Sequence, residues 1–159
     1  MSKPLVIHRE SVKKDWVDYN GHMNVAYYVL IFDNATDAFL ETAGIDEAYR
    51  ISTDRSVFVV ESHITYDQEV LADSSVEIST FLLNWDEKKL HLFHSMHPAG
   101  SEDTLATIEI MLLHVNLTTR KTASIPENIK RHLQTIADQH AHFPRPAKAG
   151  RQVTFRNAS

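Results

Sequence analysis

The chain of 159 residues contains no cysteine, which excludes disulfide bonds, thiolate metal sites and a cysteine nucleophile. Glycine is scarce as well, with four residues in the whole sequence. There is no glycine-rich phosphate loop, no dinucleotide fingerprint and no Gly-x-Ser-x-Gly nucleophile elbow. Phosphate binding by a glycine cradle and serine-hydrolase chemistry are therefore excluded, and we predict no cofactor.

Long apolar runs and an excess of positive charge are also missing. The longest apolar segment, residues 25–32, is followed by Asp33 and Asn34 and is far too short to span a membrane. The N-terminus has neither the apolar core nor the cleavage site of a signal peptide. A formal net charge of −5 disfavours non-specific nucleic-acid binding. We expect a soluble, cytoplasmic protein without a membrane or nucleic-acid partner.

The apolar spacing predicts one α+β domain over residues 1–159. Apolar residues three and four positions apart indicate a long helix from Asn24 to about Ala43, ended by Gly44. The first half of this helix is apolar on most sides, so we expect it to be buried there and exposed further on. Four consecutive segments that alternate or are strongly apolar then predict an antiparallel meander curved around the helix, with strands at 57–66, 75–83, 89–96 and 105–115.

Shorter elements complete this picture. We expect a short strand at residues 5–7, a short helical piece at 45–51 and a last helix from Pro126 through Ala137. From Gln139 onward, prolines and polar residues indicate an extended C-terminal tail over residues 139–159.

The most distinctive stretch is a polar loop directly ahead of the long helix. Asp18, Asn20 and His22 place a carboxylate, an amide and an imidazole before the helix start. Gly21 allows a tight turn there, and Asn20 or Asn24 can cap the helix. The loop is either a polar site or a capping loop with spare polar residues.

A second candidate is Glu61, which interrupts the apolar strand at 57–66 and shares a face with Val57 and Val59 by simple alternation. If that face is buried, the carboxyl needs a partner or a shifted pKa. The alternatives are that the face is partly exposed to solvent, or that Glu61 pairs with an arginine across a dimer interface.

Ten histidines raise the question of a metal site. On a strand with a period of two, His94 points to the opposite face from His91 and His97, so the three cannot bind one ion. His140 and His142 would share a face, but they lie in the expected tail. We predict no metal site.

The motif at residues 18–24, DYNGHMN, followed by Tyr27 and a long helix, resembles the hotdog-fold acyl-CoA thioesterases of the 4-hydroxybenzoyl-CoA thioesterase-like kind. The resemblance continues at residues 64–66, ITY, and returns at 116–121 with the later pair Ile125-Pro126. It implies an antiparallel sheet wrapped around a central helix. One departure is Asn116, which stands where this family usually has an aspartate.

Three segments are most similar to the thioesterases of carnitine catabolism, which occur alone or fused to L-carnitine dehydrogenase: residues 21–24, 35–37 and 112–115. The implied substrate is betainyl-CoA, a short cationic acyl-CoA. The resemblance also implies a homodimer or a dimer of dimers with active sites between protomers, and an association with a carnitine dehydrogenase.

Thioester hydrolysis could proceed at the loop as follows. Amides at residues 24–27 would polarise the carbonyl oxygen. Asp18 or Glu61 would act as general base or nucleophile, and His22 and Asn20 would orient the reacting groups. The choice between the two carboxylates stays open, because related enzymes differ in which acid acts.

Substrate contacts can be assigned only as candidates. A quaternary ammonium prefers aromatic faces or a carboxylate, and Glu61 could add the charge. The candidates for the acyl side are Trp16, Tyr19, Asn24, Tyr27, Tyr28 and Tyr66, although aromatic residues also serve as core. The candidates for the CoA phosphates are Lys88, Lys89, Arg120 and Lys121, each of which could instead be a solvated charge.

Two rival functions fit the same resemblance. One is another hotdog activity, such as hydration of an enoyl thioester, although that activity usually carries a different loop motif. The other is a non-catalytic acyl-CoA-binding or scaffolding protein that partners a dehydrogenase. Thiol release from a panel of acyl-CoAs distinguishes these rivals from a thioesterase.

Overall fold

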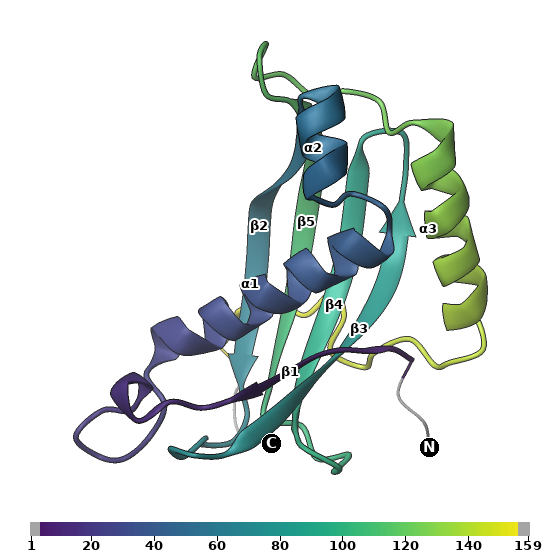
Figure 1. Ribbon diagram of the computed structural model, residues 1–159. Helices are drawn as coiled ribbons and strands as arrows, with labels where there is room; N and C mark the ends of the chain where they lie inside the picture. Colours follow the sequence, from purple (N-terminus) through teal and green to yellow (C-terminus); the bar gives the residue numbers. More distant parts are fainter. Residues whose placement is uncertain (1–3, 156–159) are drawn as a thin grey trace.

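A computed structural model describes residues 4–155 of the chain. One long helix lies across a five-stranded antiparallel sheet, and a second helix of several turns stands beside the sheet (Figure 1). The elements in chain order are β1 (Val6–Ser11), the 3-10 turn η1 (Lys14–Trp16), α1 (Val25–Thr42), α2 (Glu47–Thr53), β2 (Arg55–Tyr66), β3 (Ser75–Trp85), β4 (Lys89–Pro98), β5 (Ala106–Asn116) and α3 (Glu127–His140). This arrangement confirms the predicted α+β hotdog fold.

The strand order differs from the predicted four-stranded meander. The order across the sheet is β1-β3-β4-β5-β2, so β3, β4 and β5 form a meander, but β2 pairs with β5 at one edge. The prediction placed β2 beside β3 because it read residues 71–74 as a tight hairpin turn. Instead, the connection from Asp67 to Ser74 carries the chain from the β2 edge toward the opposite edge of the sheet. There β3 pairs with β1, which is the edge strand.

Both ends of α1 follow the sequence signals. The side chain of Asn24 accepts a hydrogen bond from the Ala26 amide at 3.0 Å, which makes Asn24 the N-cap. At the other end Gly44 has a φ of +90°, and a Cβ atom added to this residue would lie 2.9 Å from His132 Nδ1. A side chain is therefore excluded at Gly44 both by backbone conformation and by the packing of α3.

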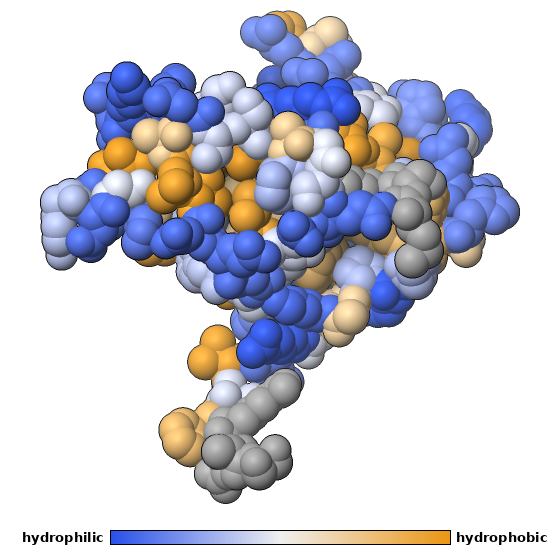
Figure 2. Space-filling view, turned by 90° about the horizontal axis from the view of Figure 1, so that it is seen from below, coloured by the Kyte–Doolittle hydropathy of each residue, from blue (hydrophilic) through white to orange (hydrophobic). Residues whose placement is uncertain are grey.

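Burial along α1 is the reverse of the prediction. The second half is the deeply buried part, with Ala35 and Phe39 fully enclosed. In the first half Val25, Val29 and Leu30 are 57%, 44% and 40% exposed. The sheet covers one side of the helix start, and the all-round apolar composition there leaves hydrophobic side chains at the surface. From below, hydrophobic side chains gather toward the side where α1 begins, among hydrophilic neighbours (Figure 2).

A β-bulge in β2 changes which residues face the helix. Val59 pairs with Leu112 and Glu61 pairs with Met111, so Val60 is an extra residue between consecutive partners on β5. Directly opposed residues in an antiparallel pair share a face. Val57 and Val59 therefore lie on the helix side and Glu61 on the open side, and the predicted common face for the three residues is wrong.

α3 and the C-terminal segment complete the fold. β1 covers only the first part of β3, and α3 packs beside the rest, where His140 Nδ1 accepts a hydrogen bond from the Leu82 amide at 2.9 Å. α3 thus runs through His140, two residues into the segment expected to be an extended tail. No helix within residues 4–155 is long and apolar enough to cross a membrane.

Candidate active site at the start of α1

The polar loop is a closed turn that leads directly into α1. Val17 and Met23 form an antiparallel bridge, and between them the Asp18 amide donates to the His22 carbonyl at 2.9 Å. The Gly21 amide donates to the Asp18 carbonyl, also at 2.9 Å, and Gly21 has a φ of +79°. These contacts fix the positions of Asp18 and His22 relative to the helix start.

The two oxygens of the Asp18 carboxylate have different roles. Oδ1 accepts hydrogen bonds from the Asn20 amide at 2.8 Å and from the His22 amide at 3.3 Å, which stabilises the turn. Oδ2 makes no hydrogen bond within residues 4–155, and the side chain is exposed. One oxygen therefore holds the carboxylate in place, while the other is available to a water molecule or a ligand.

Fewer amides at the helix start are free than the sequence suggested. Of residues 24–27, the Asn24 amide donates to the Trp16 carbonyl, the Ala26 amide to the Asn24 side chain, and the Tyr27 amide to the Asn24 carbonyl. The Val25 amide alone makes no hydrogen bond in the part of the chain that the structure describes. The predicted set of four polarising amides reduces to this one, at the positive end of the helix dipole.

His22 has a partner that the sequence analysis missed. Its Nε2 lies 2.7 Å from Oε2 of Glu69, and both side chains are about half exposed. Glu69 belongs to the loop between β2 and β3, which is held against the polar turn by a hydrogen bond from the Met23 amide to the Val70 carbonyl at 2.7 Å. A charged residue in a loop carries no periodic signal, and nothing in the sequence spacing links positions 22 and 69.

The aromatic candidates divide into packed and accessible rings. Trp16 is buried and stacks on Tyr27 with ring centroids 5.2 Å apart, so this pair packs as core around the turn. Tyr28 is also buried, and the edge-to-face contact with Tyr66 has a centroid separation of 5.1 Å. Tyr66 is 47% exposed and Tyr19 97% exposed. Burial raises the pKa of both Tyr28 and Tyr66 above that of a free phenol.

Within one chain, Glu61 lies away from the polar turn that holds Asp18 and His22. It lines a cavity of about 260 Å³ on the open side of the sheet, together with His63, His91, Glu109 and Arg151. Glu61 is exposed and makes no side-chain hydrogen bond or ion pair within residues 4–155. The structure therefore brings Asp18 and His22 together and leaves Glu61 across the sheet from α1.

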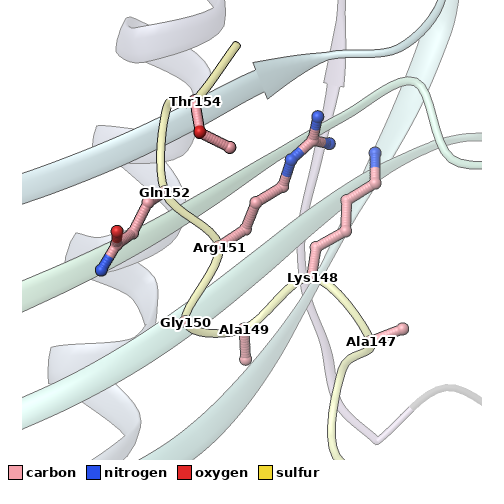
Figure 3. Close-up of a pocket in the computed structure, with 7 residues that line it drawn as sticks. All are labelled: Ala147, Lys148, Ala149, Gly150, Arg151, Gln152 and Thr154. Carbon is pink, nitrogen blue, oxygen red and sulfur yellow. The ribbon is translucent and has the colours of Figure 1, made fainter. Parts of the chain in front are cut away.

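The C-terminal segment passes over this cavity. The Gly150 amide donates to Glu109 Oε2 at 2.7 Å, and Lys148 Nζ lies 2.5 Å from Asp67 Oδ2. The close-up shows the chain crossing the strands, with the Lys148 and Arg151 side chains extending in the same direction (Figure 3). His91 Nε2 pairs with the other Glu109 oxygen at 2.7 Å, so Glu109 joins β4 to the tail.

His94 faces the helix, on the opposite face of β4 from His91, and this opposition is the one predicted from the strand period. Thr36 Oγ1 donates to the Phe32 carbonyl at 2.9 Å, so His94 Nε2 donates to Thr36 at 3.0 Å and its Nδ1 accepts from Thr80 at 2.8 Å. Burial lowers the pKa of His94 to about 3. Both ring nitrogens are satisfied in the neutral form, which makes His94 a structural residue.

The other buried histidines, His97, His114 and His140, also have hydrogen-bond partners. His97 Nε2 lies 3.0 Å from Ser79 Oγ, and His114 Nε2 lies 2.8 Å from the hydroxyl of Tyr49. His140 is buried on α3, whereas His142 follows the helix and is exposed. No group of three metal-ligating side chains occurs among residues 4–155.

The four basic candidates for CoA binding gather at one end of the sheet. Lys88 lies in the β3–β4 turn and Lys89 begins β4, and the Lys88 carbonyl accepts a hydrogen bond from the His114 amide. Arg120 and Lys121 follow the end of β5, and the Arg120 guanidinium lies 5.6 Å from the centroid of the Phe58 ring. The Tyr66 end of β2 lies at the opposite end of the sheet, roughly 35 Å from Arg55 at the rise of a β-strand.

Comparison with known proteins identifies the family of this chain. The profile of the thioesterase-like superfamily matches residues 12–133. Betainyl-CoA thioesterase of Pseudomonas aeruginosa is 37% identical over 153 residues, which cover 96% of both chains. L-carnitine dehydrogenase/betainyl-CoA thioesterase of Rhizobium meliloti is 38% identical over 152 residues, but the matched region is 30% of that longer protein.

Solved structures give the same family. A Pseudomonas putida protein provisionally described as a thioesterase superimposes with a TM-score of 0.85 at 35% identity, covering 99% of both chains. A Staphylococcus aureus protein in complex with CoA has a TM-score of 0.89 at 24% identity, which supports the shared fold. The chain therefore belongs to the thioesterase-like superfamily.

Proposed function

We propose that this protein hydrolyses a short cationic acyl-CoA of the betainyl type to the free acid and CoA. The observation that carries the proposal is the free Asp18 oxygen on a rigid turn directly ahead of the unbonded Val25 amide. Those are the two groups that thioester hydrolysis requires, a base or nucleophile and a donor for the carbonyl oxygen. The betainyl part rests on the relative from P. aeruginosa, which matches along nearly its whole length.

The reaction balances with these groups alone. The thioester carbonyl oxygen accepts from the Val25 amide while Asp18 removes a proton from water. The water oxygen bonds to the carbonyl carbon, the carbon–sulfur bond breaks, and the proton passes to the departing CoA sulfur. Alternatively Asp18 attacks the carbonyl carbon directly and the carbon–sulfur bond breaks to release CoA thiolate. Water then hydrolyses the resulting mixed anhydride, which frees the acid and restores the Asp18 carboxylate, and a proton from this water neutralises the thiolate. His22 and Asn20 orient the carboxylate and the water in either route.

Glu61 becomes the weaker candidate for the base. It faces the open side of the sheet because of the bulge at Val60, whereas α1 packs on the other side. We therefore assign the reaction to Asp18 and treat Glu61 as part of the open-side cavity.

We also propose that two copies join through β2. This strand is an edge of the sheet, and Phe58, Val59 and Val60 are 40%, 48% and 54% exposed. If β2 pairs antiparallel with β2 of a second copy, the Arg55 end of one strand lies beside the Tyr66 end of the other. The basic turns of one copy, with Lys88 and Arg120, then approach the polar turn of its neighbour.

This symmetry would place the CoA phosphates and the thioester in one site shared by two protomers. Dimers can assemble further into a dimer of dimers. We further propose that the protein is cytoplasmic and folds as a single domain. An association with a carnitine dehydrogenase is also proposed, because the relative from R. meliloti is named for both activities.

Two experiments test the function and the assembly. Thiol release should be measured on a panel that contains betainyl-CoA and straight-chain acyl-CoAs, and we expect betainyl-CoA to be the preferred substrate. Failure to release thiol from any member would refute the thioesterase and favour an acyl-CoA-binding scaffold. In sedimentation, we expect a dimer that Val60→Lys converts to a monomer with little activity.

A further inference from the structure

His22 of the polar turn contacts one carboxylate, Glu69, to which the proposed hydrolysis mechanism assigns no role. Glu69 reaches His22 from the neighbouring loop, with 61% of the Glu69 side chain exposed to solvent. Its Oε2 contacts the imidazole, while its Oε1 makes no hydrogen bond or ion pair in the part of the chain that the structure describes. An exposed carboxylate with a free oxygen therefore stands beside the proposed catalytic groups.

Accessible aromatic surface lies on the strand that leads into the Glu69 loop. Tyr66 ends β2 only three residues before Glu69, and its half-exposed ring packs edge-on against Tyr28. The Tyr28 hydroxyl donates to the Gln68 carbonyl at 3.4 Å, which ties this loop to α1. Burial raises the pKa of the Tyr28 phenol, and the negative charge of Glu69 adds to the rise. Glu69 is thus close enough to act electrostatically on the Tyr28 phenol, against which Tyr66 packs.

The chemical structure of the proposed substrate restricts where its positive charge can be bound. In a betainyl thioester the quaternary nitrogen is separated from the reacting carbonyl carbon by one methylene group. Whatever recognises this cation must therefore lie next to the groups that act on the carbonyl. A quaternary ammonium offers no N–H donor, so it is bound by aromatic faces and by opposite charge.

We propose that Glu69 is the specificity-determining residue that selects a cationic acyl group, with its free oxygen facing the quaternary ammonium beside the ring of Tyr66. This proposal rests on the thioesterase function proposed above. It is distinct from a role for Glu69 in positioning His22, and the two roles have different kinetic signatures. The positive charge is present in both substrate and transition state, so losing its partner weakens both equally and raises KM. Misplacing His22 would instead lower kcat for every substrate.

The test compares two acyl groups of nearly the same shape. Betainyl-CoA carries a quaternary nitrogen where 3,3-dimethylbutyryl-CoA carries a quaternary carbon. For Glu69→Gln we expect kcat/KM on betainyl-CoA to fall roughly tenfold, mainly through KM, and kcat/KM on the neutral isostere to change less than about twofold. Glu69→Asp should recover part of the loss.

Asp73→Asn is the matched control. It removes the same charge from the same loop, and asparagine tolerates the φ of +63° at that position. We expect this variant to treat both substrates as the wild type does. An equal loss on both substrates for Glu69→Gln, or no loss on betainyl-CoA, would overturn the selectivity role. Failure of the proposed function is recognised separately, since wild-type protein would then release thiol from neither substrate.

Discussion

The Glu109 junction on the open side of the sheet and the turn ahead of α1 carry similar residues with different amounts of spare hydrogen-bonding capacity. On the open side, His91 and the Gly150 amide occupy both oxygens of Glu109. At the start of α1, Asp18 uses one oxygen to hold its turn and leaves the other free, ahead of an unbonded amide. We therefore propose the site at the start of α1, where a free carboxylate oxygen lies ahead of an unbonded amide at the positive end of the helix dipole.

The largest effect should come from removing the charge of Asp18. Asp18→Asn keeps Oδ1 in the turn but removes the base or nucleophile, so we expect kcat/KM for acyl-CoA hydrolysis to fall by about 10²–10⁴-fold. The measurement is free-thiol release at saturating and limiting substrate. Asp15→Asn, three residues earlier on η1, is the control and should retain wild-type activity. Full activity of Asp18→Asn would move the chemistry away from this loop.

The next effect concerns stability on the helix side. The pKa of His94 is about 3 in the folded protein, against 6.5 ordinarily, so between these values the unfolded chain binds one more proton. Stability is therefore full above pH 6.5 and falls as the pH drops, with a slope of up to about 1.4 kcal/mol per pH unit. Burial also lowers the pKa of His114 and His140, which act in the same direction.

His94→Gln tests this contribution. Losing one of the two threonine contacts should cost about 2 kcal/mol at pH 7.5, and the remaining pH dependence between pH 6.5 and 5 should be flatter than in the wild type. Urea unfolding at several pH values measures both quantities. The exposed His142→Gln is the control. An unchanged slope in His94→Gln would mean that other groups dominate acid destabilisation.

A smaller effect is expected at the junction on the open side. Glu109→Gln keeps the shape of the side chain but weakens its contacts with His91 and Gly150, at a cost of about 1 kcal/mol. The tail should detach more readily, so trypsin should cleave after Lys148 or Arg151 faster than in the wild type. Glu41→Gln, on the exposed face of α1, provides the control for the charge change. Unaltered cleavage would show that Glu109 does not hold the tail.

The smallest effect is the most discriminating one. Glu61 has no side-chain partner within residues 4–155 and faces away from α1. Glu61→Gln should therefore change kcat/KM by less than about twofold and stability by less than about 0.5 kcal/mol. The same thiol assay measures it alongside Asp18→Asn. A loss comparable to that of Asp18→Asn would reverse the contrast between the two sides of the sheet.

The fold could be predicted where the signal is local. The helix limits at Asn24 and Gly44 were correct because capping depends on neighbouring residues. The position of β2 was wrong because strand pairing depends on contacts between residues far apart in sequence. The side faced by Glu61 was wrong because one extra residue, Val60, reverses an alternation that the sequence alone presents as continuous.

The candidate site was likewise predictable only where its contacts are local in the sequence. The motif residues Asp18 and His22 lie together, since a short turn holds them. Glu69 was missed because its proximity to His22 arises from the packing of two loops 47 positions apart (69 − 22). The exposure of the first half of α1 was also missed, because an apolar pattern cannot distinguish a surface buried by its own chain from one left open.

The bulge in β2 has a consequence for which strands can add to this edge. An unprotected edge strand is a template for indiscriminate association and aggregation. A regular strand laid along β2 would match the pleat on one side of Val60 and be out of phase on the other. A second copy carries the same irregularity at the middle of its own strand. We therefore expect β2 to pair with β2 of a second copy and not with most strands of other proteins.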